Sequence, residues 1–383
     1  MSPMSDDALR RVRITGVSTP QLQWALGDEF AVPASVLRAI GVGDTTRELD
    51  LNQWPAPSAD GVASTVRLRA AYTEQPPHSH RLPFNYHLVP PQVRWVIARY
   101  LGSRLRKRQS QWAQFPGWPL DLSADFVADW CSSDAGTLPV HSPTPVLLTH
   151  DIDSLEGLRN LVERFLPIEE AHGVRSTNYI VPCAWTLDHG LLREVVARGH
   201  DIGVHGYDHT NRTPFLETAE RRQRLLAGKE ALAPYGPTGY RAPSLARTAA
   251  LVEDLADFYA YDSSIPTSGG PFPVFNNGCA TARPFIVGRT IEIPVSMRRD
   301  GTARFLGHTA EDIGRFWIDD ARTISAARGT VMLLTHCEDR FSGNRPMLDA
   351  YGRFIDFVVS SPQFHWRTPR EIAAQAAALL RAA

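Results

Sequence analysis

The hydrophobic pattern of the chain changes character after residue 145. Short apolar runs bounded by turn residues, such as Val146–Thr149 and Thr177–Val181, are typical of buried strands. Between them lie longer stretches whose apolar residues recur every three or four positions, which predicts amphipathic helices. Repeated alternation of strand and helix predicts an α/β fold, in which helices cover a parallel sheet that is either a barrel or doubly wound.

The same pattern assigns an element to most of the remaining sequence. We expect a helix from Leu155 to the region of Gly173, because glycine commonly ends a helix. Further strands are expected at Asp201–Val204, Gly239–Arg241, Phe258–Tyr261, Thr290–Val295 and Thr330–Thr335. Further helices are expected at Leu191–Arg198, Phe215–Leu232, Thr248–Asp257, Thr309–Ala327, Pro346–Val359 and Pro369–Ala382.

The first 140 residues follow a different pattern. They are rich in Pro and Trp, with strand-like runs such as Thr65–Tyr72 and one helical stretch near Pro91–Arg106, and they contain no cluster of catalytic side chains. A turn-rich linker, His141–Pro145, closes this region. We therefore expect an N-terminal accessory region at 1–140, of undefined role, and an α/β domain at 141–383.

Polar side chains gather at the ends of the predicted strands. Asp151 and Asp153 follow the strand that ends at Thr149. The corresponding positions at other strand ends are held by His205, His209, Arg241, Asp262 and His336. In a barrel of parallel strands the carboxyl ends form one rim, where reacting groups collect. We therefore expect these side chains to converge.

Asp151 and Asp153 are separated by one residue, so in an extended chain both carboxylates point to the same side. Two like charges this close are costly unless a cation or an arginine lies between them. Asp153 could instead cap the helix that begins at Ser154–Leu155. The pair alone leaves both interpretations open.

His205 and His209 are four residues apart, so both rings can reach one cation if the intervening loop coils. Two imidazole nitrogens and one carboxylate are the usual protein ligands of an open catalytic divalent site. The alternative is a pair of surface histidines in a turn.

Three further residues have both a catalytic and a structural interpretation. Arg241, before Ala-Pro243, could hold a carboxylate or form a structural salt bridge. His336 follows the apolar run Val331–Leu334 and could be a reacting group or a satisfied core histidine. Cys337 beside it is not expected to be the nucleophile, because the metal set supplies one and no base is assigned to the thiol.

Composition and charge narrow the class of protein. The 383-residue chain is 43% hydrophobic and 21% charged, as in soluble globular proteins, and its formal charge of -1 gives no electrostatic footprint for nucleic acid or an anionic membrane. Its four cysteines are far apart, which excludes a disulfide framework and a cysteine zinc site. We see no signal peptide and no apolar run approaching about 18 residues, so we expect a cytoplasmic protein without a membrane partner. The pattern indicates no oligomeric state.

Taken in order, the polar segments resemble the five motifs of the polysaccharide deacetylase (NodB-homology) family, the family-4 carbohydrate esterases. The matching segments are Thr149–Asp153, His205–His209, Tyr240–Pro243, Asp262–Ser264 and Leu333–His336. Their order and spacing together are far more specific than any single motif. One departure is Ile152, which separates two aspartates that are adjacent in the common first motif. This spacing resembles the D-x-D branch, which includes peptidoglycan deacetylase-like and allantoinase-like members.

The resemblance implies a distorted (β/α)7 barrel and assigns a role to each residue. It assigns the metal to Asp153, His205 and His209. It implies that Asp151 is the catalytic base, that Arg241 holds this base, that His336 is the acid and that Asp262 orients His336. His150 stands where the commoner motif has an aromatic residue, and we expect it to pack or to support the site from behind.

Zinc is the first candidate for two histidines and a carboxylate, and cobalt, nickel, iron or manganese also suit these ligands. We therefore expect a metal-dependent hydrolase that removes an N-linked acyl group from an amino sugar or sugar-containing intermediate. Acetyl is the first candidate for this acyl group. The split aspartates keep open an amidase or cyclic imidase acting on a non-sugar small molecule. A non-catalytic carbohydrate-binding relative is the second alternative, although the presence of Asp151 and His336 argues against it.

Overall fold

The computed structural model describes the α/β fold and several shorter segments before it. The described residues are 9–15, 29–33, 45, 47–50, 89–112, 143–267, 282, 284–287, 289–326 and 329–382. The predicted strand-like run Thr65–Tyr72 and most of the predicted accessory region lie outside these residues. No helix in the described ranges is both long enough and apolar enough to cross a membrane.

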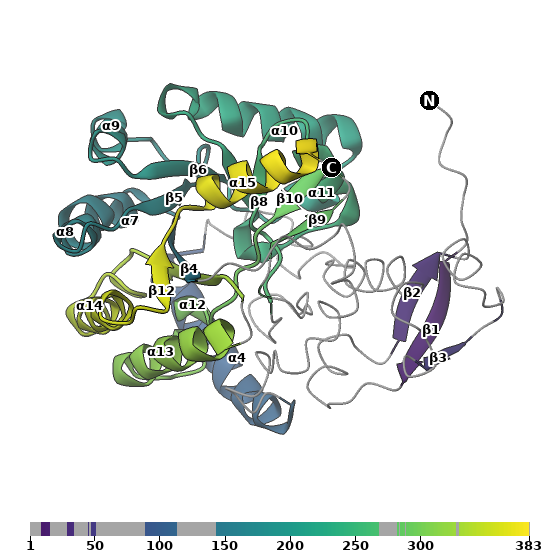
Figure 1. Cartoon of the computed structure of the whole chain (residues 1–383), viewed down its shortest axis with the longest axis horizontal. Coiled ribbons are helices and arrows are strands. Elements are labelled where there is room, and N and C mark those ends of the chain that lie inside the picture. The colour runs from purple at the N-terminus through teal and green to yellow at the C-terminus, as the bar shows by residue number, and fades with distance from the viewer. Residues whose placement is uncertain are drawn as a thin grey trace.

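A curled, open sheet forms the centre of the fold (Figure 1). Along the described part of the sheet, seven neighbouring parallel strands follow the order β11 (Val331–His336), β4 (Thr144–Ile152), β5 (Ser176–Ile180), β6 (Asp201–His205), β7 (Gly239–Arg241), β8 (Tyr261–Asp262) and β10 (Thr290–Glu292). The short β9 (Phe285–Val287) pairs antiparallel with β10, and β12 (Phe364–Trp366) pairs parallel with the first residues of β4. The predicted α/β fold is confirmed, as a distorted half-barrel and not a doubly wound sheet.

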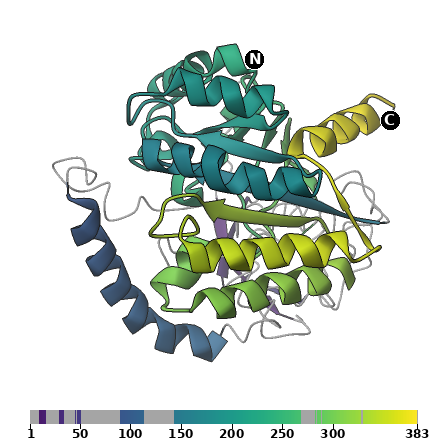
Figure 2. The ribbon, with the colours of Figure 1, turned by 90° about the vertical axis from the view of Figure 1, so that its left-hand side faces the viewer.

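Most helices cover the outer side of this sheet (Figures 1 and 2). The helices of the domain are α7 (Leu155–Asn160), α8 (Leu166–Ala171), α9 (His189–Ala197), α10 (Thr218–Ala231), α11 (Ala249–Leu255), α12 (Asp300–Phe305), α13 (Ala310–Ala326), α14 (Arg345–Val359) and α15 (Pro369–Ala382). Helix α15 differs from most of them, because its buried residues pack in the inner apolar cluster. Before the sheet, the described elements are β1 (Leu9–Thr15), β2 (Glu29–Pro33), β3 (Glu48–Asp50) and α4 (Pro91–Trp112). The first three form a small sheet of their own.

The two-residue period of β4 decides which side chains reach the inside of the barrel. Leu147 belongs to the inner apolar cluster, whereas Leu148 and Ile152 belong to the cluster between sheet and helices. Thr149 and Asp151 share the side of Leu147 because successive side chains of a strand alternate. In β11, Met332 and Leu334 belong to the inner cluster, and His336 follows at the same spacing.

The strand register then brings the polar ends level with one another. His336 of β11 lies beside Asp151 of β4, and His205 of β6 lies beside Arg241 of β7. Asp151 was predicted to follow its strand, but β4 continues to Ile152, so this carboxylate lies within the strand. The sheet therefore fixes its position more firmly than a loop would.

The predicted helix from Leu155 is interrupted. A π-helical turn at Leu161–Phe165 separates α7 from α8, and Pro167 follows it. Proline lacks the N–H that an α-helix would use, so a break at this point is expected. Gly173 ends the helical region with a φ of +68°, as predicted from its sequence.

Helix α4, expected near Pro91–Arg106, packs against α12. The Trp95 ring lies 5.3 Å from the Phe305 ring and 5.7 Å from the Phe341 ring, measured between centroids. Gly102 lies so close to α12 that a Cβ there would be 2.3 Å from the Phe305 carbonyl oxygen. Only glycine allows this approach, so α4 is held against the half-barrel at this point.

Gly102→Ala should therefore lower stability although alanine is the better helix former. Overpacking of this kind costs about 1–3 kcal/mol, more than the ~1 kcal/mol that helix propensity returns. Gly352→Ala in α14 is the matched control, since a Cβ there meets nothing within 4 Å and should stabilise. Thermal unfolding measures both variants. An equal gain in Tm for the two would show that α4 does not pack this closely.

Candidate metal centre and active site

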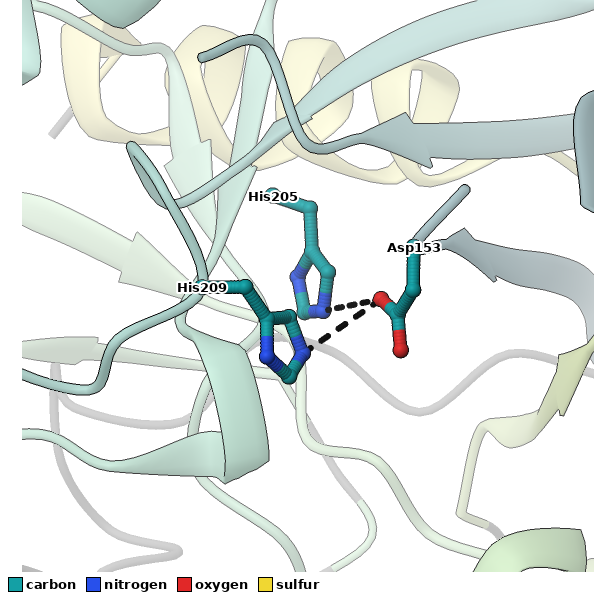
Figure 3. Close-up of side chains that lie close together, drawn as sticks. All are labelled: Asp153, His205 and His209. Carbon is teal, nitrogen blue, oxygen red and sulfur yellow. Dashed lines mark ion pairs between the residues drawn. The ribbon is translucent and has the colours of Figure 1, made fainter. Parts of the chain in front are cut away.

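Asp153, His205 and His209 converge at the carboxyl ends of the strands (Figure 3). Asp153 directly follows β4, His205 is the last residue of β6, and His209 lies in the loop after it. Asp153 Oδ1 lies 3.5 Å from His205 Nε2 and 3.4 Å from His209 Nε2. One ligand atom from each residue lies within 4.8 Å of the others, so the three can hold one metal ion.

The loop after β6 is coiled by unusual backbone conformations. Gly206, His209 and Asn211 all have positive φ values, of +68°, +58° and +61°. A positive φ is uncommon for residues other than glycine, and it persists where the surroundings enforce it. At Gly206 a Cβ would lie 2.4 Å from Pro243 Cδ, so glycine is required there. The coil brings both histidine rings to the same carboxylate.

A backbone contact fixes the tautomer of His205. Its Nδ1 lies 3.0 Å from the Arg241 carbonyl oxygen, which can only accept a hydrogen bond. Nδ1 therefore carries a proton and donates it, so in the neutral ring the lone pair is on Nε2, the atom that faces Asp153. Histidine ligands of metals are commonly oriented in this way.

The surroundings of Asp153 fit a cation. Its Oδ1 is buried and accepts no hydrogen bond from the described residues. Burial would raise the pKa of this carboxyl, but the charges of His209 and His205 outweigh burial and lower it. The alternative that Asp153 caps a helix does not hold, because Ser154 Oγ accepts the capping hydrogen bond from Gly157 N at 3.1 Å. A divalent ion would satisfy the orphaned oxygen.

Arg241 is fully buried and binds Asp151. All five of its N–H donors are engaged. The acceptors are Asp151 Oδ1 at 2.9 Å, Thr149 Oγ1 at 3.0 Å, Ser263 O at 3.1 Å, Ser263 Oγ at 3.0 Å and Met332 Sδ at 3.2 Å. The contact anticipated from sequence between these two residues is therefore present, with the guanidinium fixed in one orientation.

The charge of Asp151 follows from this contact. Burial would raise the pKa of the carboxyl, but the charges of His205 and Arg241 outweigh burial and lower it. Burial likewise acts to lower the pKa of Arg241, and the charge of Asp151 outweighs it. The second oxygen, Asp151 Oδ2, lies 3.6 Å from His205 Nε2. An ionised carboxylate thus has one oxygen held by arginine and the other beside the metal ligands.

His336 is oriented by Asp300 and not by Asp262, so that prediction was wrong. Asp300 Oδ1 lies 2.8 Å from His336 Nδ1, and Asp300 Oδ2 accepts hydrogen bonds from His336 N and Ser342 Oγ, both at 2.7 Å. Burial acts to lower the pKa of His336, but the charge of Asp300 raises it to about 10. His336 is therefore a cation, and its Nε2–H, which Asp300 does not contact, can donate a proton.

Asp262 supports a different part of the rim. Its Oδ1 accepts a hydrogen bond from Ser264 Oγ at 2.6 Å, and Ser264 Oγ accepts one from Ala242 N at 2.8 Å. Burial raises the pKa of Asp262 to about 6, and burial together with the charge of Asp262 raises that of Glu292 far more. The pair is thus one carboxylate and one neutral acid, and it braces the chain just after Arg241.

His150 and Cys337 lie on the outer side of the sheet. His150 Nδ1 lies 2.7 Å from Thr335 Oγ1 and its Nε2 lies 2.9 Å from Glu169 Oε1, in agreement with the expected supporting role. Cys337 is fully buried, and burial raises the pKa of its thiol well above the ordinary value. A protonated buried thiol is a poor nucleophile, as its sequence context suggested.

Sequence reasoning missed Asp300 and Glu338. Asp300 lies a few residues after the predicted strand Thr290–Val295, so the strand-end argument applied to that strand could have found it. Glu338 accepts a hydrogen bond from Ser154 Oγ at 2.7 Å, and burial together with the charge of Asp153 raises its pKa to about 7. No sequence pattern distinguished this glutamate from a surface residue.

Comparisons with known proteins found a matching family model and similar folds. Residues 140–260 match the family described as Polysaccharide deacetylase. The fold is similar to that of a protein described as a polysaccharide deacetylase from Mycobacterium smegmatis, with 20% identity over 64% of this chain and 93% of that chain and a TM-score of 0.51.

Two further solved structures are similar at lower scores. One is described as a polysaccharide deacetylase from Pseudomonas aeruginosa, with 16% identity over 61% of this chain and 91% of that chain and a TM-score of 0.48. The other is PuuE allantoinase, with 17% identity over 65% of this chain and 95% of that chain and a TM-score of 0.49. The search of curated proteins gave no match. The segment 140–260 therefore resembles the polysaccharide deacetylase family, and the described α/β domain shares its fold with a solved structure described as a polysaccharide deacetylase.

Proposed function

We propose that the protein is a metal-dependent hydrolase that removes an N-linked acyl group from an amino sugar or a sugar-containing intermediate. Acetyl is the first candidate for the acyl group. The observation that carries this proposal is the combination at one rim of a metal-binding triad, an arginine-held carboxylate and a carboxylate-held imidazolium. Hydrolysis of an amide requires activation of a water molecule, removal of a proton from that water, and protonation of the departing nitrogen. The three groups can perform these steps in that order.

The residues divide the chemistry as follows. A divalent ion held by Asp153, His205 and His209 would polarise the acyl oxygen and lower the pKa of a water molecule. Asp151 takes the proton of that water on Oδ2, since Oδ1 is engaged by Arg241. The water oxygen bonds to the acyl carbon. The C–N bond then breaks as His336 gives the Nε2 proton to the nitrogen, which is too basic to leave as an anion.

Zinc is the first candidate for the ion, because two imidazole nitrogens and one carboxylate are its common catalytic ligands. Cobalt, nickel, iron and manganese also suit these atoms. The ion can be identified by metal analysis of protein purified without added metal.

The separation of Asp151 and Asp153 by Ile152 favours one alternative, an amidase or imidase acting on a non-sugar compound. A panel of N-acetylated amino sugars and cyclic imides distinguishes the two. We expect acetate release from at least one sugar and no ring opening of the imides. Ring opening alone would support the alternative, and activity on neither class would favour a non-catalytic carbohydrate-binding relative.

Removal of any metal ligand should remove the metal and the activity. Asp153→Ala, His205→Ala and His209→Ala each leave two protein ligands, too few to hold the ion in an open site. Metal content per folded chain measures this directly. Full occupancy in all three variants would contradict the assignment.

Asp151→Asn should keep the metal and lose activity. The amide cannot take a proton from water, so kcat should fall by about 10²–10⁴, the usual range for one positioned acid or base. Metal analysis and steady-state kinetics on the same sample test this. If Asp151→Asn loses the metal and Asp153→Asn keeps it, the roles of the two aspartates are exchanged.

Asp300→Asn should move the basic limb of the pH profile of kcat/KM to lower pH. The Asp300 charge raises the pKa of His336, so without it the imidazolium loses its proton at a lower pH and the acid is lost sooner. The matched control is Asp262→Asn, because the Asp262 side chain contacts Ser264 and Glu292 and should leave this limb in place. A shift in Asp262→Asn and none in Asp300→Asn would restore the original sequence prediction.

A further inference from the structure

Two arginines beside the rim have no role in the chemistry above. Arg299 directly precedes Asp300 at the start of α12, and Arg340 follows β11 by four residues. Both side chains are half-buried. Within the described part of the chain, neither guanidinium makes a hydrogen bond or an ion pair with a protein group.

Three other arginines that are fully or partly buried in the fold are paired with carboxylates. Arg221 contacts Asp254 at 2.6 Å, Arg241 contacts Asp151 at 2.9 Å, and Arg298 contacts Asp320 at 2.7 Å. Burying an unpaired cation costs free energy, and a carboxylate partner offsets this cost. An arginine kept partly buried without such a partner is able to bind an anion from outside the chain.

Their neighbours place both arginines at the catalytic rim. Asp151 and Asp300 are the carboxylates whose charges act on Arg299, and they partly offset the burial that lowers its pKa to about 10. Arg340 acts on the other side, where its charge lowers the pKa of Asp153. Arg299 therefore lies near the catalytic base and Arg340 near the metal ligands.

An aromatic contact fixes Arg340 relative to the proposed acid. Its guanidinium carbon lies 5.0 Å from the centroid of the Phe341 ring, and that ring lies 4.8 Å from the His336 ring. Arg340 Nε is buried and has no hydrogen-bond partner. The Arg340 guanidinium thus packs against the Phe341 ring, close to His336, and its N–H groups can still donate hydrogen bonds.

We propose that Arg299 and Arg340 bind an anionic group of the substrate, so the substrate is an acidic N-acylated compound that carries a carboxylate or a phosphate. This inference rests on the proposed hydrolase function and adds the charge class of its substrate. Both anions accept the forked hydrogen bonds that a guanidinium donates.

The kinetic test uses three probes that share one acetamide group. They are N-acetylglucosamine, which is neutral, N-acetylmuramic acid, which carries a carboxylate, and N-acetylglucosamine 1-phosphate. We expect kcat/KM for at least one acidic probe to exceed that for the neutral probe tenfold or more, and the preferred probe identifies the anion. Equal or better turnover of the neutral probe would overturn the inference.

Substitution of the arginines tests whether they cause the preference. Arg299→Gln and Arg340→Gln should each lower the acidic-to-neutral ratio of kcat/KM by tenfold or more. Arg315→Gln is the matched control, because Arg315 is an exposed arginine of α13 paired with Asp312 and should leave the ratio unchanged. A ratio unchanged in both rim variants would assign the preference elsewhere and overturn the inference.

A binding measurement separates this inference from the proposed function. The metal-loaded Asp151→Asn protein is titrated calorimetrically with each probe, alone and with either rim substitution added. Tighter binding of an acidic probe that is lost with the arginines supports the inference even if no acetyl group is ever released. Acetyl release combined with arginine-independent binding would keep the hydrolase and discard the anion site.

Discussion

The buried ion pair between Arg241 and Asp151 is the interaction on which the rest of the site depends. Removing one partner of such a pair leaves an uncompensated buried charge, at a cost of about 3–5 kcal/mol. The guanidinium also joins four parts of the sheet, because its acceptors lie on β4, on β11 and just after β8, and its own strand is β7. One side chain thus fixes both the charge of the proposed base and the relative position of the strand ends.

The other groups of the site are placed by the sheet that this pair braces. The register sets His336 beside Asp151 and His205 beside Arg241, so the acid, the base and the metal ligands share one level. The carbonyl of Arg241 then fixes the tautomer of His205. Asp300 sets the orientation and the charge of His336. Arg241 has the same effect on Asp151.

Much of this arrangement is predictable from sequence, and the failures have physical reasons. The period of the apolar runs predicts the strands, and parallel strand ends predict that Asp153, His205 and His209 converge. The resemblance implied that Asp262 orients His336, and this was wrong because sequence spacing does not reveal which carboxylate faces an imidazole across the barrel. Asp300 begins a six-residue helix that has no clear hydrophobic period, so α12 escaped detection. The accessory region stays a prediction because most of it lies outside the described residues.

We propose that this rim hydrolyses an amide with the help of a metal ion in the Asp153–His205–His209 triad. The most direct measurement is acyl release from an N-acetylated amino sugar before and after chelation, followed by titration with zinc. We predict that chelation abolishes release and that recovery is complete at one zinc ion per chain. Release that persists in fully metal-free protein, or protein that binds one ion per chain and releases nothing across the sugar panel, would contradict the account.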